Sequence, residues 1–168
     1  MSDHQIQILL VEDNPNDIKL ALHAFKTHNL ANAVHVIRDG AEALEFIFGT
    51  QRYAGRNTAS GPKLILLDLK LPLVDGIEVL RRIKADEQTC LTPVVVMTSS
   101  NEERDMIESY RLGVNSYIRK PVDFNQFSEA VRQLGYYWLL LNQIPRSPAP
   151  CENVAVPGAG LNLAGVAD

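Results

Sequence analysis

The sequence predicts a doubly wound α/β fold: a five-stranded parallel sheet of order 2-1-3-4-5 with helices on both faces. Five short runs of branched apolar residues alternate with stretches that carry apolar residues at helical spacing. The strand candidates are apolar almost throughout, as expected of strands that are covered on both faces. About 140 residues hold all five pairs, which suits one domain of this kind.

The first unit is a strand, an acid pair and a helix. The run Ile6–Val11 is the expected strand, and it ends in the adjacent acids Glu12 and Asp13. In the run Asn14-Pro15-Asn16-Asp17, the asparagine can cap a helix, proline suits its first position, and the aspartate lies in the first turn, where the helix dipole favours negative charge. The apolar residues of this helix are Ile18, Ala21, Leu22 and Phe25.

The second unit pairs the strand Ala33–Ile37 with a helix that follows Asp39-Gly40 and ends at Gly49. Its apolar stripe consists of Ala43, Leu44, Ile47 and Phe48. The stretch Thr50–Pro62 shows no period, and we expect a long surface loop there.

The third strand, Leu64–Leu67, is the most apolar, and it stops abruptly on Asp68. This places Asp68 at the carboxyl edge of the sheet, where open α/β sheets bind ligands. The alternative is that Asp68 only caps the following turn. Asp75-Gly76 opens the third helix, whose apolar residues are Ile77, Leu80 and Ile83.

The fourth strand, Pro93–Met97, runs into Thr98. Ser100 and Glu103 have the spacing of a capping box, so we expect them to start the fourth helix, which ends at Gly113. The apolar residues of this helix are Met106, Ile107 and Tyr110.

Tyr117 and Ile118 lie in the short fifth strand, which is followed by Lys120-Pro121. Asp123 with Gln126 can cap the last helix. We expect the core stripe of this helix to be Phe127, Val131, Leu134, Trp138 and Leu141. We therefore expect one domain over residues 1–144 and a Pro/Gly/Ala-rich, disordered tail over residues 145–168.

The predicted strand order brings distant side chains together. Strands one and three are neighbours, so Glu12, Asp13 and Asp68 meet at one edge of the sheet. The ends of strands four and five add Thr98 and Lys120 to the same crevice.

The chemistry of this crevice fits phosphoryl transfer. Converging carboxylates repel one another unless a cation relieves them, and an oxygen-only set suits Mg²⁺. The ammonium of Lys120 and the hydroxyl of Thr98 supply the positive charge and the hydrogen-bond donor that a phosphoryl group needs. Asp68 is the carboxylate best placed as a nucleophile, which would give an aspartyl phosphate.

With these residues in place, the chain from about Ile6 to Leu141 resembles the receiver domain of two-component response regulators, which has a flavodoxin-like fold. The matching positions are the metal-binding acids Glu12 and Asp13, the phosphoacceptor Asp68, the switch hydroxyl Thr98, the switch aromatic Tyr117, and Lys120 before Pro121, a proline that is typically cis in this family. The resemblance implies that Mg²⁺ is also held by the backbone carbonyl of Lys70, and that the phosphoryl group comes from a kinase histidine. It implies a phosphoryl acceptor with intrinsic self-phosphorylation and dephosphorylation chemistry rather than an enzyme in the usual sense.

More narrowly, the chain resembles the single-domain regulators that serve bacterial and cyanobacterial phytochrome histidine kinases. The runs that carry this resemblance are Glu12-Asp13-Asn14-Pro15, the loop after the second helix, Leu67-Asp68-Leu69-Lys70-Leu71-Pro72, Ser109-Tyr110-Arg111-Leu112-Gly113, and the last helix with Trp138. The implied partner is a phytochrome-type sensor histidine kinase.

The output must occur by contact, since the tail is too short for a DNA-binding or enzyme domain. We expect phosphorylation to draw Thr98 towards the phosphoryl group, to turn Tyr117 inward and so to alter the face formed by the fourth helix, fifth strand and fifth helix. The helical wheel leaves Tyr136, Leu139 and Leu140 outside the core, which predicts a homodimer through this face. The alternative is that the tail covers these residues.

The composition argues against DNA and membranes as binding partners. With 16 basic against 20 acidic residues the net charge is -4, which gives no electrostatic footprint for DNA or an anionic membrane. No secretory signal and no apolar run of about 18 residues is visible, so we expect a cytoplasmic protein that binds neither nucleic acid nor membrane.

Three other functions share parts of this pattern. A Mg²⁺-dependent phosphatase of the haloacid dehalogenase type also forms an aspartyl phosphate. Such enzymes require a second aspartate, the general acid, two positions after the nucleophile, and this chain has Lys70 there. A flavodoxin-like mononucleotide binder needs a phosphate-cradling loop after the first strand, and here that loop is acidic. A receiver that never accepts phosphate and acts as a scaffold is the third alternative, against which the full set of site residues argues.

Overall fold

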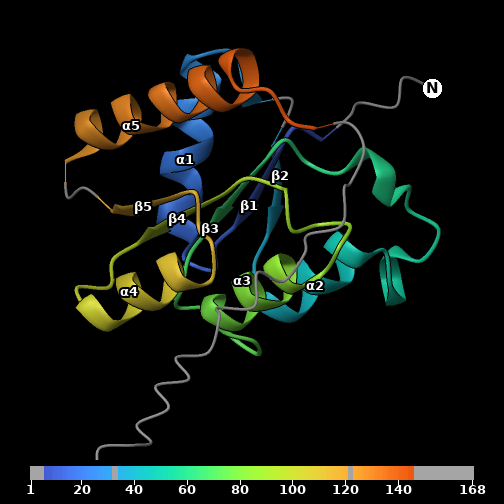
Figure 1. The fold of residues 1–168 in the computed structure, drawn as a ribbon. Coiled ribbons are helices and arrows are strands. Elements are labelled where there is room, and N and C mark those ends of the chain that lie inside the picture. Colours follow the sequence, from blue (N-terminus) through green and yellow to red (C-terminus); the bar gives the residue numbers. More distant parts are fainter. Residues whose placement is uncertain (1–5, 32–33, 121–122, 146–168) are drawn as a thin grey trace, which may run out of the picture.

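A computed structural model describes residues 6–31, 34–120 and 123–145 of the chain. The described strands form one parallel sheet of order β2-β1-β3-β4-β5, which confirms the predicted topology (Figure 1). The strands are β1 (Ile8–Val11), β2 (Val34–Ile37), β3 (Leu64–Leu67), β4 (Val94–Thr98) and β5 (Ser116–Arg119).

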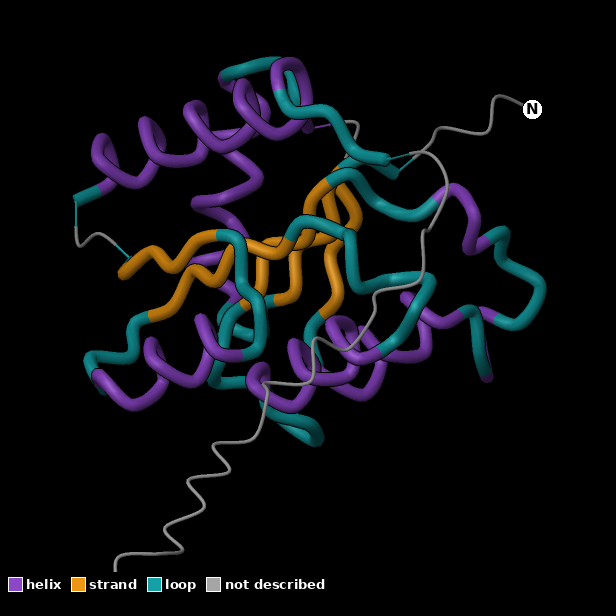
Figure 2. Tube along the Cα trace, viewed as in Figure 1, coloured by secondary structure: helices purple, strands orange, loops and turns teal. Residues whose placement is uncertain are grey.

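The helices lie in two layers, one on each face of the sheet. They are α1 (Pro15–Thr27), α2 (Gly40–Phe48), α3 (Gly76–Ala85), α4 (Glu103–Arg111) and α5 (Phe124–Tyr136). Figures 1 and 2 show α1 and α5 together on one face and α2, α3 and α4 on the other. Since both faces are covered, the side chains of β1, β3 and β4 are buried throughout, which explains their unbroken apolar sequences.

Strand register brings the acidic residues to one edge. Val11 lies opposite Leu67 in the pairing of β1 with β3, so the next residues, Glu12 and Asp68, leave the sheet side by side. The backbone amide of Asp68 donates to the carbonyl of Val11 at 3.0 Å and continues the ladder past the last strand residue. Pairing of these two strands therefore sets the position of both carboxylates.

The helix starts expected at Asn14, Asp75 and Asp123 are confirmed, the structure adds a cap at Asp39, and the expected capping box of the fourth helix is wrong. Side chains at the N-caps of α1, α2, α3 and α5 accept backbone hydrogen bonds; these caps are Asn14, Asp39, Asp75 and Asp123. The N-cap of α4 is Glu102, whose side chain makes no capping bond, so Ser100 and Glu103 form no capping box. The Ser100 hydroxyl instead donates to Asp105 Oδ2 at 2.7 Å and accepts from the Glu102 amide at 3.3 Å.

The predicted apolar face of α4 is largely exposed. Ile107 and Tyr110 are 45% and 54% exposed, and the buried residue of this helix is Ser109. Ser109 satisfies its hydroxyl locally, by donating to the Asp105 carbonyl at 2.7 Å. The helical period was present, but it marks an outward surface instead of a core stripe.

The end of α5 departs from a regular α-helix. A π-helical turn, Tyr137–Leu141, continues it, with the Asn142 amide donating to the Tyr137 carbonyl at 2.7 Å. A π-turn holds more residues than an α-turn, so it rotates the side chains that follow. Leu139 is therefore buried and Leu141 is 55% exposed, the reverse of the prediction from an α-helical wheel.

The segment after α2 is the long surface loop that the sequence predicted, and it contains two short 3₁₀ turns, Gln51–Tyr53 and Thr58–Ser60. The Tyr53 hydroxyl donates to Glu42 Oε1 at 2.7 Å, and Arg56 Nη1 donates to the Phe46 carbonyl at 3.0 Å. These bonds fasten the loop to α2. The predictions for Ala33, for the peptide bond of Pro121 and for the tail over residues 146–168 lie outside the described residues.

Gly76 fits α3 against the loop that carries Asp68. A Cβ atom at this position would lie 2.2 Å from the Asp68 carbonyl oxygen and 2.6 Å from the Leu69 Cα. The neighbouring atoms belong to the backbone, so they cannot yield by a change of rotamer.

We expect Gly76→Ala to lower the free energy of unfolding by about 1–3 kcal/mol, because the added methyl group forces two backbone segments apart. Gly61→Ala is the matched control, since its Cβ would meet Thr58 at an ordinary 3.7 Å. Denaturant unfolding of both variants measures the difference. Equal midpoints for the two would contradict the close packing at Gly76.

Candidate functional site

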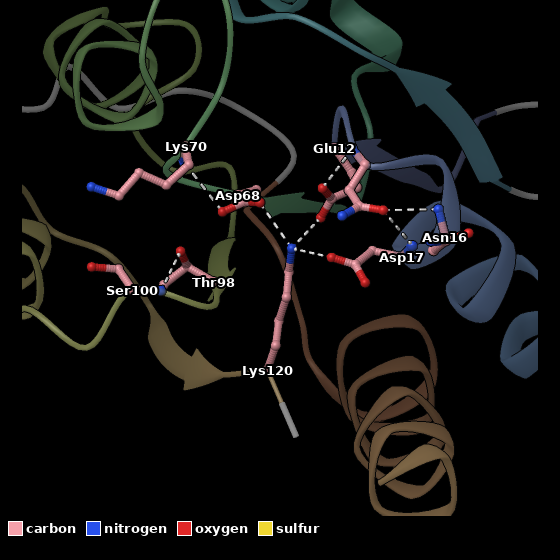
Figure 3. A network of polar contacts seen from close by, with 9 residues as sticks. Glu12, Asn16, Asp17, Asp68, Lys70, Thr98, Ser100 and Lys120 are labelled. Carbon is pink, nitrogen blue, oxygen red and sulfur yellow. Dashed lines mark hydrogen bonds and ion pairs between the residues drawn. The ribbon is translucent and has the colours of Figure 1, made fainter. Parts of the chain in front are cut away.

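Lys120 lies at the centre of an acidic cluster at the carboxyl edge of the sheet (Figure 3). Its Nζ atom donates to Glu12 Oε2 at 2.6 Å, and to Asp17 Oδ2 and Asp68 Oδ2 at 2.8 Å each. The four residues come from the end of β1, the first turn of α1, the end of β3 and the residue after β5. One ammonium group therefore joins segments more than one hundred positions apart in the sequence.

Most of this cluster is shielded from solvent. The side chains of Glu12 and Asp68 are 5% exposed and that of Lys120 is 10% exposed, whereas Asp17 is 28% exposed at the mouth of the site. Burial, together with the nearby charge of Asp68, raises the pKa of Glu12 to about 7, although Lys120 opposes the shift. Burial alone would lower the pKa of Lys120, but its three carboxylate partners outweigh burial and raise it.

Three carboxylates at this edge of the sheet are arranged so that they could bind a cation. Ligand oxygens of Glu12, Asp13 and Asp68 lie within 4.8 Å of one another, so the structure brings together the three acids that the sequence singled out. Asp13 is exposed and so opens this group to solvent. Carboxylate oxygens in this arrangement are suited to Mg²⁺ or a similar hard divalent ion.

Lys70 lies beside the same carboxylate through its backbone. Its amide donates to Asp68 Oδ1 at 3.2 Å, so both oxygens of Asp68 have protein donors. The Lys70 ammonium points to α4, where it lies 3.7 Å from Asp105 and 3.8 Å from Glu102. A role of the Lys70 carbonyl as a metal ligand stays a prediction.

The two expected switch residues lie on adjacent strands. Thr98 is fully buried at the end of β4, and its Oγ1 accepts from the Ser100 amide at 3.2 Å. On β5, the Tyr117 hydroxyl is already buried; its burial and the charge of Asp105 raise the pKa of this phenol. We expected Tyr117 to turn inward on phosphorylation, but its hydroxyl is buried in this structure as well. The switching role of Tyr117 stays a prediction.

Asp17 is the site residue that the sequence did not reveal. The helix dipole alone accounts for an aspartate in the first turn of a helix, so the sequence indicates no further role for it. Its position in the sequence does indicate a place near the site. Asp17 follows the acid pair Glu12 and Asp13 by less than two helical turns, on a helix that starts at the same sheet edge.

Together, the doubly wound sheet and the acid–lysine cluster at its carboxyl edge define an α/β domain with a candidate cation site beside a lysine-bound aspartate. The chain belongs to the response regulator receiver domain family, whose profile matches residues 8–132.

Several relatives cover almost the whole domain. FilR2 of Methanothrix harundinacea (strain 6Ac), a probable methanogenesis regulatory protein, is 40% identical over 143 residues, which are 85% of this chain and 88% of that protein. Response regulator Rcp1 of Synechocystis sp. is 38% identical over 138 residues, which are 82% of this chain and 92% of Rcp1.

Two solved structures extend the comparison. The phosphorylated cyanobacterial phytochrome response regulator RcpA aligns with a TM-score of 0.77 at 39% identity, over 84% of this chain and 99% of that chain. The Mn²⁺-bound form of Rcp1 aligns with a TM-score of 0.75 at 38% identity, over 82% of this chain and 97% of that chain. As to membranes, the helices of the described segments are all too short or too polar to cross one.

We expect Lys120→Met to lower the free energy of unfolding by about 3–5 kcal/mol at neutral pH without divalent ions, because it leaves buried carboxylates without their counter-charge. Added Mg²⁺ should restore part of the loss. Lys70→Met is the control: this ammonium is 60% exposed and its acidic partners lie at 3.7 Å or more, so about 0–1 kcal/mol is expected. Thermal and urea unfolding with and without Mg²⁺ compare the two, and equal losses would contradict the central place of Lys120.

Proposed function

We propose that this protein is a response regulator that accepts a phosphoryl group from a sensor histidine kinase onto Asp68, with Mg²⁺ as cofactor. The observation that carries the proposal is the contact of Lys120 with Asp68 at 2.8 Å, beside the cation-binding group of Glu12, Asp13 and Asp68. Membership of the receiver family supports it. Under this proposal, residues 1–144 form the receiver domain and residues 145–168 a tail.

Each site residue has a defined task in this reaction. A carboxylate oxygen of Asp68 attacks the phosphorus of a phosphohistidine, the P–N bond breaks, and the imidazole leaves with the bonding electron pair and takes up a proton. Lys120 neutralises the transferred phosphoryl oxygens, and the Thr98 hydroxyl donates to one of them. Glu12, Asp13, Asp68 and the Lys70 carbonyl would hold Mg²⁺, which supplies further charge neutralisation when bound.

We infer that the phosphodonor is a phytochrome-type histidine kinase. This inference is supported by the likeness to RcpA, a cyanobacterial phytochrome response regulator, over 84% of this chain. FilR2, at 40% identity, is a probable methanogenesis regulatory protein, so a kinase unrelated to phytochrome is the alternative donor. The rates of phosphorylation by a panel of purified kinases, one of them a phytochrome, decide between these sources.

A specific surface supports output through a homodimer. Apolar side chains are exposed on α4, at Ile107 and Tyr110, and near the end of the α5 segment. The residues of the second group are Tyr136, Tyr137, Leu140 and Leu141. We propose that a second copy of the chain covers this α4–β5–α5 face, and that phosphorylation changes the strength of the contact.

Incubation with Mg²⁺ and acetyl phosphate should add one hydroxylamine-sensitive phosphoryl group per chain, and Asp68→Asn should abolish it. Asp39→Asn is the control, since Asp39 caps α2 and an asparagine preserves that cap. Intact-mass spectrometry measures the incorporation. Rapid turnover of excess donor would instead indicate a phosphatase, and a wild-type protein that stays unmodified would indicate a scaffold.

Leu140→Arg should shift the protein from dimer to monomer, because it places a charge within the apolar group at the end of α5, where Leu140 is 66% exposed. Leu91→Arg is the control, since Leu91 is an exposed leucine, at 41%, in the loop after α3 and outside the proposed surface. Sedimentation velocity with and without phosphorylation gives the mass. A wild-type protein that is monomeric at all accessible concentrations in both states would contradict this surface assignment.

A further inference from the structure

Asp17 contacts the functional cluster, yet it lies outside the group of acids that can bind a cation. Its Oδ2 accepts a hydrogen bond from Lys120 Nζ at 2.8 Å (Figure 3). The cation-binding group consists of Glu12, Asp13 and Asp68. The position of Asp17 therefore calls for an explanation that does not involve metal binding.

The geometry around Lys120 supplies the first step. An ammonium group has three N–H donors, and Lys120 directs them to three carboxylate oxygens at 2.6 to 2.8 Å. Lysine has a flexible four-carbon stem, so an ammonium held from three sides is fixed far better than one held from two. Asp17 holds it from the side of α1.

The other two partners of Lys120 have further tasks. On the proposed function, which this inference assumes, Glu12 is a metal ligand and Asp68 forms the bond to phosphorus. Both carboxylates change their environment during the reaction, whereas Asp17 takes part in neither event. Of the three partners, Asp17 is thus the one that can hold Lys120 in place throughout.

Local structure keeps Asp17 in a defined position. The N-cap side chain Asn14 accepts from the Asn16 amide at 2.9 Å and from the Asp17 amide at 3.3 Å. The Asn14 amide in turn donates to Glu12 Oε1 at 3.0 Å. A single capped turn therefore orients both Glu12 and Asp17 around the same ammonium.

We propose that Asp17 is a positioning residue for phosphoryl transfer: it anchors the Lys120 ammonium from α1, so that the ammonium stays directed at the phosphoryl group when the metal and phosphorus engage Glu12 and Asp68. The hydrogen bond is what matters for this role, more than the negative charge. An asparagine, which keeps an acceptor oxygen at the same place, should therefore serve in part.

The test compares Asp17→Ala, Asp17→Asn and the control Asn16→Ala, an exposed residue of the same turn. With acetyl phosphate and Mg²⁺, Asp17→Ala should lower the maximal rate of phosphorylation roughly tenfold, the size expected for losing one hydrogen bond to a charged group. The donor concentration at half-maximal rate should change little. Asp17→Asn should recover most of the rate, and Asn16→Ala should match the wild type.

A second measurement needs neither phosphorylation nor metal. The ¹⁵N–¹H NMR signal of the Lys120 ammonium should be visible in the wild type, because bonded N–H groups exchange slowly with water. It should broaden beyond detection in Asp17→Ala and persist in Asp17→Asn.

Unchanged rates and an unchanged signal in Asp17→Ala would overturn the anchoring role. Faster phosphorylation of both Asp17 variants would also overturn it, since that result would mark Asp17 as a competitor for Lys120. A wild-type protein that takes up no phosphoryl group would overturn the proposed function instead, and the NMR comparison would still test the anchor itself.

Discussion

The site depends on one ammonium group among converging carboxylates. Parallel pairing of β1 with β3 ends both strands together, so Glu12 and Asp68 are forced into the same small volume. Lys120 bonds to both, and without it the two carboxylates would repel each other at a place where water screens charges only weakly. The positive charge that follows β5 therefore offsets the repulsion that the register of β1 and β3 creates.

Much of this arrangement follows from the sequence because its causes are local. The run Leu64–Leu67 is apolar at every position, which is typical of a central parallel strand, and the first polar residue after it, Asp68, must then lie at the sheet edge. Asn14 and Asp75 are caps that act within their own helices. Strand order adds the rest, since this topology makes β1 and β3 neighbours whatever their separation along the chain.

The features that the sequence did not predict arise from contacts between elements. Leu139 is buried and Leu141 is exposed, the reverse of what the apolar period predicts, because α5 continues as a π-turn. The period of apolar residues does not reveal such a turn. Ile107 has helical spacing, but spacing alone does not say whether a helix face meets a core or a partner. Asp17 satisfied a simple rule about helix dipoles, and only the path of the chain after β5 shows that it also meets Lys120.

Short links join the site to α4. Thr98 accepts from the Ser100 amide, and the Ser100 hydroxyl donates to Asp105 in the first turn of α4. The Lys70 ammonium approaches the same aspartate from the loop that follows Asp68. On the proposed function, movement of Thr98 towards a phosphoryl group would pull on the Ser100 amide, and through Asp105 it would act on α4. Ile107, which is exposed, follows Asp105 by two residues on the same helix, so these contacts reach the element that carries part of the exposed apolar residues.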